Sequence, residues 1–149
     1  MAVRGTIYHH RRLVFKNGVA GIKYIILLNT PGPNDPYLFV KTTTQKKDKP
    51  SKPGCIENLS LFFIPAKTTF FQSDTWIQLH EIYSITPDDV IKDSDITEEG
   101  SFDLNLIEKI VNCLFLSSED DISPDHRRLL RPPLKESLKK LQTKFGKKP

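Results

Sequence analysis

Residues 37–45 read Tyr-Leu-Phe-Val-Lys-Thr-Thr-Thr-Gln, and residues 46–54 directly after them read Lys-Lys-Asp-Lys-Pro-Ser-Lys-Pro-Gly. The apolar and β-branched residues of the first stretch predict a buried strand. This strand ends in three hydroxyl groups and an amide, beside a loop that carries four lysines. Hydroxyl donors next to flexible cations suit the binding of a phosphate group.

Apolar stretches on both sides of this strand predict the remainder of a small sheet. Residues 22–28 are almost continuously apolar, which indicates a central strand covered on both faces. Further strands are expected at residues 3–9, 59–64, 75–79 and 80–86, and a short helical turn is expected at Pro87.

A helix is predicted over residues 101–116, because its apolar side chains recur at intervals of four. Ser101 is the expected N-cap, and Asp103 would interact favourably with the N-terminal dipole. The predicted fold is α+β, mainly β: a small, strongly bent sheet or barrel of five or six short strands, packed with one C-terminal helix. Residues 1–116 are taken as one domain.

Residues 117–149 are expected to be a linker followed by a basic amphipathic extension. Residues 118–121 read Ser-Glu-Asp-Asp, which is typical of a solvated linker. Apolar residues then recur at helical spacing with lysines between them, at Leu134, Leu138, Leu141 and Phe145. A helix of about three turns is too short to be stable alone, so it would dock on the domain or order on a partner.

Charge is segregated along the chain. Residues 1–67 carry eleven Lys/Arg against three Asp/Glu, residues 68–123 carry two against thirteen, and residues 124–149 carry nine against two. Basic segments of this kind favour an anionic partner, of which nucleic acid is the first candidate. For the C-terminal segment, folding back on the acidic middle is an equally good explanation.

The cytoplasm is the expected compartment. No apolar run approaches the roughly 18 residues that span a membrane, and the N-terminus lacks the apolar region of a signal peptide.

The two cysteines, Cys55 and Cys113, show no paired spacing. We therefore expect two reduced thiols, neither a disulfide nor a metal site.

Several common catalytic motifs are missing from the sequence. It contains no glycine-rich phosphate loop, no nucleophile elbow and no histidine spacing suited to a metal, so neither a cofactor nor a metal is expected. His9 and His10 adjoin, but adjacent strand residues point to opposite faces and would not converge on one ion. Metal-free chemistry on a phosphate, or binding alone, remains.

RNA carries its own nucleophile, the 2′-hydroxyl. A protein that cleaves it needs a base, an acid for the departing 5′-oxygen, and donors for the charge on the phosphorane. Each candidate also has a purely structural explanation, since threonines favour strands and polar loops often contain histidines. The candidates are Lys23, Thr42, Thr43, Thr44, Gln45, His9, His10, Arg11 and Arg12.

The order of three segments resembles the MazF/PemK family of bacterial toxins. These are Arg-Gly-Thr-Ile-Tyr at residues 4–8, the strand at 22–29 after a glycine-bearing loop, and the strand at 39–45 that ends in Thr-Thr-Thr-Gln. Residues 62–65 and 73–79 look like the family's next strands. The resemblance covers about residues 3–116.

This resemblance implies a small SH3-like half-open barrel with a C-terminal helix, usually a homodimer. It implies the toxin of a type II toxin–antitoxin system, which cleaves single-stranded RNA without a metal and leaves a 2′,3′-cyclic phosphate. The partners would be single-stranded RNA and an acidic antitoxin, with no membrane involved.

Residue by residue, the resemblance places the family threonine on Thr43 and the family arginine on Lys23. Lysine is a departure, since it is a point charge on a flexible stem and acts as a base only if its pKa is lowered. His9 or His10 would supply the missing proton transfer. The residues expected to bind RNA are Arg11, Arg12, Lys41, Thr42, Thr44, Gln45, Lys46, Lys47 and Lys49.

Two other classes of function remain open. One is a non-enzymatic module of the same fold that binds RNA or a protein target, as the related gyrase poison CcdB does. The other is an interaction protein whose C-terminal extension docks into a partner's groove as a helix.

Overall fold

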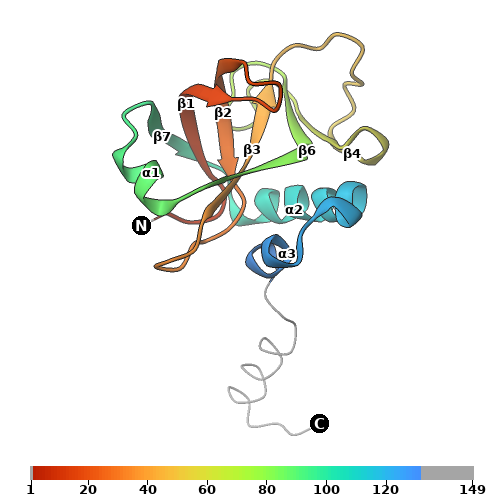
Figure 1. Ribbon diagram of the computed structural model, residues 1–149. Helices are drawn as coiled ribbons and strands as arrows, with labels where there is room; N and C mark the ends of the chain where they lie inside the picture. The colour runs from red at the N-terminus through yellow and green to blue at the C-terminus, as the bar shows by residue number, and fades with distance from the viewer. Residues whose placement is uncertain (1, 132–149) are drawn as a thin grey trace, which may run out of the picture.

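The computed structural model describes residues 2–131, so the amphipathic segment predicted near residues 134–145 lies outside the described residues. Seven strands form one curved, antiparallel sheet in the order β4–β5–β6–β3–β2–β1–β7, with helix α2 along one side (Figure 1). The predicted class, α+β and mainly β, is confirmed. The strands are β1 (Thr6–Val14), β2 (Ala20–Leu27), β3 (Tyr37–Thr43), β4 (Gly54–Ile56), β5 (Leu61–Ile64), β6 (Thr75–Ile85) and β7 (Ile96–Ser101).

The central strands bury both of their faces. In β2, Ile26 belongs to a cluster that packs against helix α2 (Leu104–Ser118), whereas Ile25 belongs to a cluster on the opposite side that includes Val90 of helix α1 (Pro87–Lys92). We call these sides the α2 face and the α1 face. Side chains alternate between them because successive strand residues point in opposite directions.

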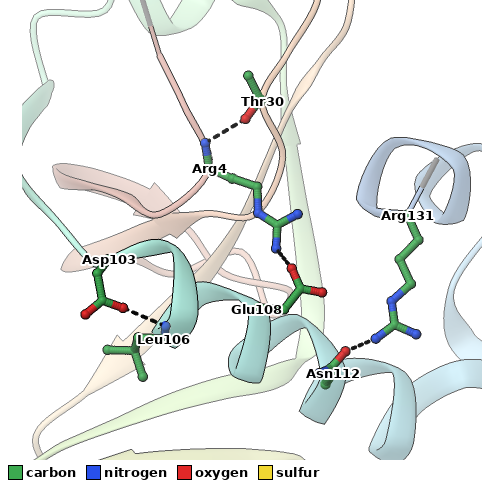
Figure 2. A network of polar contacts seen from close by, with 7 residues as sticks. All are labelled: Arg4, Thr30, Asp103, Leu106, Glu108, Asn112 and Arg131. Carbon is green, nitrogen blue, oxygen red and sulfur yellow. Dashed lines mark hydrogen bonds and ion pairs between the residues drawn. The ribbon is translucent and has the colours of Figure 1, made fainter. Parts of the chain in front are cut away.

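The N-cap of helix α2 lies two residues later than predicted. Asp103 is the N-cap, and its carboxylate accepts a hydrogen bond of 2.7 Å from the backbone N–H of Leu106 (Figure 2). Ser101 is instead the last residue of β7. A carboxylate at this position satisfies a free N–H group and lies near the positive end of the helix dipole.

The N-terminal segment is fixed to α2 by the Arg-Gly pair. The backbone N–H of Arg4 donates to Thr30 Oγ1 at 3.0 Å, and its guanidinium pairs with Glu108 of α2 (Figure 2). Gly5 follows with a φ of +96°, and a Cβ there would lie 3.0 Å from the backbone oxygen of Phe102. This glycine is therefore needed both for its conformation and for the close approach of the Phe102 backbone, just after β7.

Several elements differ from the sequence prediction, and the sheet has seven strands where five or six were expected. The stretches 75–79 and 80–86 form one continuous strand, β6, and neither the short strand β4 nor the polar strand β7 was predicted. The segment expected to be a solvated linker contains a 3₁₀ turn and helix α3 (Pro124–Leu130), and both Ile122 and Leu130 are buried in the α2-face cluster. Single apolar residues in a polar stretch give no periodic pattern, so tertiary packing decides these elements.

The expectation of two reduced thiols was wrong. Cys55 of β4 and Cys113 of α2 form a disulfide, with 5.5 Å between their Cα atoms and a separation of 58 positions in sequence. The pairing arises because the edge strand β4 lies beside α2, a contact that spacing along the chain does not reveal.

Loss of this disulfide should destabilise the fold. Closing a loop of this length restricts the unfolded chain, so reduction should lower the free energy of unfolding by about 2–4 kcal/mol. Urea unfolding with and without reductant measures the change. The C55A/C113A variant is the control, since reductant should leave its midpoint unchanged; an equal midpoint for reduced and oxidised native chain would contradict the prediction.

The Gly5→Ala variant should lose about 1–3 kcal/mol of unfolding free energy, because it combines a strained φ with a contact to backbone. Gly18→Ala is the matched control: its φ is +86°, but nothing lies within 4 Å of the added Cβ. Thermal unfolding should rank the two, with Gly5→Ala the less stable. Equal losses would mean that conformation alone matters at residue 5.

Candidate functional site

The structure divides the predicted site residues between the two faces. His10 pairs with Lys23 across β1 and β2, and Ile25 pairs with Lys41 across β2 and β3. Since residues two apart share a face, His10, Lys23, Lys41 and Thr43 all lie on the α1 face. The strands β1, β2 and β3 thus contribute to one surface.

His9 and Thr42 belong to the opposite, α2 face. The ring of His9 packs on that of Tyr24, with 5.0 Å between centroids. The hydroxyl of Thr42 donates to the backbone oxygen of Tyr24 at 2.9 Å. The structure therefore does not bring either residue to Lys23 and Thr43, and the Thr42 hydroxyl is occupied in holding β3 to β2.

Lys23 lies in a cluster of cations. Burial lowers its pKa below the ordinary value, and the nearby charges of Lys41 and then Lys49 lower it further. Its Nζ is 5.9 Å from the centre of the Phe15 ring, and the Nζ of Lys41 is 5.6 Å from the same centre. No ion pair within residues 2–131 involves Lys23, so its amine is available to an anion or a proton.

Lys41, by contrast, is paired. Its Nζ lies 3.5 Å from Glu81 Oε1 and 3.3 Å from the Tyr83 hydroxyl, and this hydroxyl donates to the same Glu81 oxygen at 2.8 Å. Burial and then the bond to Glu81 raise the pKa of Tyr83, which keeps the phenol protonated. The Lys41 amine is therefore held by Glu81 and Tyr83, while its charge helps to lower the pKa of Lys23.

Thr43 and His10 are well covered, at 8% and 7% exposed. Thr43 Oγ1 accepts from the backbone N–H of Gln45 at 3.2 Å, which leaves its own proton free to donate. His10 Nδ1 accepts from the backbone N–H of Arg12 at 3.2 Å, and burial is the main cause of its lowered pKa. With Nδ1 accepting this bond, the neutral imidazole of His10 carries its proton on Nε2.

The remaining predicted residues lie on exposed loops and strand ends. Arg11 bonds the turn before β7, with its guanidinium 3.4 Å from the backbone oxygen of Ser94. The lysine loop, residues 46–53, is anchored where the Trp76 indole donates to the Pro50 backbone oxygen at 2.8 Å, and Lys49 donates to the Gln45 backbone oxygen at 3.0 Å. Arg12, Thr44, Gln45, Lys46 and Lys47 are exposed.

Sequence reasoning missed Phe15, which lies near both lysines, and Glu81 and Tyr83, which contact Lys41. Phe15 lies beyond a predicted strand, and Glu81 and Tyr83 lie within one, but none of these positions carries a motif. The contact of Glu81 and Tyr83 with Lys41 depends on the bend of β6, and the position of Phe15 depends on the β1–β2 hairpin. A groove of about 530 Å³ between β6 and the α2–α3 segment contains none of the predicted site residues.

Neither the known protein-family models nor the curated proteins include a match to this chain. Within residues 2–131, no helix has both the length and the apolar character needed to cross a membrane. The same residues contain no group of three or more His, Cys, Asp or Glu arranged to hold a metal ion.

The Lys41–Glu81 pair should matter more to stability than surface ion pairs. Its side chains are 12% and 17% exposed, so Glu81→Gln should cost about 1.5–3 kcal/mol by weakening a charged hydrogen bond. Glu119→Gln, whose side chain is 61% exposed and pairs with Arg127, is the control and should cost less than about 1 kcal/mol. Urea unfolding of both variants tests this ranking, which equal costs would overturn.

Proposed function

We propose that this protein binds single-stranded RNA at the α1-face end of β2 and β3, and cleaves it through attack of the 2′-hydroxyl on the adjacent phosphate. The observation that supports this most is the position of Lys23 on the same face as the free hydroxyl proton of Thr43. The Lys23 amine has a lowered pKa and forms no ion pair with any of the residues 2–131. Together they provide a proton acceptor and a donor to a phosphate oxygen.

In the proposed reaction, neutral Lys23 takes the proton from the 2′-oxygen. That oxygen bonds to phosphorus, and the bond from phosphorus to the 5′-oxygen breaks. Thr43 donates to the non-bridging oxygens while the charge is greatest, and the Lys23 ammonium returns a proton to the leaving 5′-oxygen. The products are a 2′,3′-cyclic phosphate and a 5′-hydroxyl, and no metal takes part.

The biological setting of the proposal follows the MazF/PemK resemblance. The protein would be the toxin of a type II toxin–antitoxin system, act on cytoplasmic RNA as a homodimer, and be blocked by an acidic antitoxin. An acidic segment suits the exposed cations beside this site, Lys46, Lys47 and Arg12, by charge complementarity.

RNA binding without cleavage is the second candidate, and one observation favours it. Because Thr43 and His10 are only 8% and 7% exposed, a phosphate would meet chiefly Lys23 and the lysine loop unless that loop moves. Binding needs only those exposed cations, whereas cleavage needs access to the Thr43 hydroxyl.

The test is incubation of the full chain with an end-labelled single-stranded RNA in a chelator, with analysis of the product ends. Lys23→Ala and Thr43→Ala should each lower the cleavage rate by about 100-fold or more. Lys109→Ala, at an exposed position on α2, should leave it unchanged. A substrate methylated at every 2′-oxygen should bind but stay intact.

The cleavage rate should rise with pH and level off below pH 10.5, the ordinary pKa of lysine, because only the neutral amine accepts the proton. Lys23→Arg should lose this dependence along with activity. Intact RNA, bound with an affinity that falls steeply with salt, would reject the enzyme and support the binder.

A further inference from the structure

A second hollow lies on the α2 face of the sheet, next to the end of β3 and on the opposite side from Thr43. It has a volume of about 390 Å³ and lies between β2, the end of β3 and the segment that precedes β6. Three aromatic rings line it, with polar side chains around them: Tyr24, Phe70, Phe71, Thr44, Gln72 and Ser73. The lining contains no charged residue, which makes it unlike the cationic surface on the α1 face.

The rings are held in place by edge contacts. The Tyr24 ring lies 5.5 Å from Phe70 and 5.6 Å from Phe71, at steep interplanar angles of 70° and 77°. Phe70 also lies against the backbone of β7, since a Cβ on Gly100 would come within 2.7 Å of its ring. Because Gly100 has no side chain, the Phe70 ring can pack against the β7 backbone beside the hollow.

Two of these rings are only partly covered. Tyr24 and Phe70 are half-buried, so part of each ring is available for contact. The polar residues Thr44, Gln72 and Ser73 are exposed and can donate or accept hydrogen bonds. An uncharged hollow with aromatic walls and a polar rim suits a flat heterocycle that stacks on a ring and bonds through its edge.

The location links this hollow to the phosphate site. Thr43, the last residue of β3, lies on the α1 face, whereas Thr44, the next residue, lines the hollow on the other side. Lys23 and Tyr24 are likewise consecutive on the neighbouring strand. A nucleic acid strand that passes round the end of β3 would meet cations on one side and aromatic rings on the other.

We propose that this hollow binds one unpaired nucleobase of the RNA that the cationic surface holds by its phosphates. This inference rests on the proposed function, because the base belongs to the RNA that the protein is proposed to bind. It adds a role for Tyr24 and Phe70 in affinity and for Gln72 in the preference among bases.

The first experiment compares two single strands of equal length, one with bases and one fully abasic, by fluorescence anisotropy. Tyr24→Ala and Phe70→Ala should each weaken binding of the base-containing strand by about 5- to 150-fold, the range for losing one stacked base. Neither should change the affinity for the abasic strand. Tyr37→Ala, a half-buried aromatic on the α1 face, is the control and should change neither affinity.

Two conservative variants are the control for misfolding of the alanine variants. Tyr24→Phe and Phe70→Tyr keep the rings and should keep the affinity, and Gln72→Ala, at an exposed position, should alter the ranking among homopolymers. If the wild-type protein binds the abasic strand as tightly as the base-containing one, the hollow takes no base and the inference is overturned, while binding through phosphates stands.

A second experiment does not depend on the phosphate site. Adenosine, guanosine, cytidine and uridine, which carry no phosphate, are titrated into the full chain while the ring resonances of Tyr24 and Phe70 are followed by NMR. Shifts that saturate with at least one nucleoside support the base site even if RNA is neither bound nor cleaved. Ribose alone is the comparison, and equal shifts with ribose would mean a sugar site and overturn the proposal.

Discussion

The burial of both faces of β2 and β3 is the constraint on which the other features depend. Ile25 and Phe39 are fully buried on the α1 face, and Ile26 and Val40 are fully buried on the α2 face. A slip of one residue in the pairing Ile26↔Val40 would exchange the two sets and mismatch both cores at once. The two hydrophobic clusters therefore both select the same register. This register sets the face to which each of the other side chains on β2 and β3 points.

The candidate functional groups lie where the burial of both faces of β2 and β3 ends. Beyond Ile25 on β2 and Lys41 on β3, towards the lysine loop, the pattern continues with polar residues that keep the alternation. Lys23 and Tyr24 thus face opposite sides although they adjoin, and Thr44, just past the end of β3, lines the hollow on the side opposite Thr43. A short strand end can in this way present a cationic surface and an aromatic one, with one layer of backbone between them.

Strands with a periodic hydrophobic pattern were predicted from the sequence, whereas features that form through long-range contacts were missed. The runs at 22–28 and 37–43 are strongly patterned, so their strands were predicted closely. Strand β7 is polar and exists because it pairs with β1. The Lys41–Glu81–Tyr83 cluster depends on the bend in β6, where the pairing with β3 shifts register. The cysteines, 58 residues apart, meet only through packing of β4 on α2.

The disulfide also divides the molecule covalently. Residues 55–113 form a closed ring that contains β5, β6, α1 and β7, whereas β1, β2 and β3 lie outside it. A protease that cuts once inside the ring leaves a single covalent molecule. One cut in the exposed lysine loop instead separates the chain into two pieces, with Lys23 and Thr43 on the smaller one. The strand pairings β3–β6 and β1–β7 would then hold the two pieces together without a covalent bond.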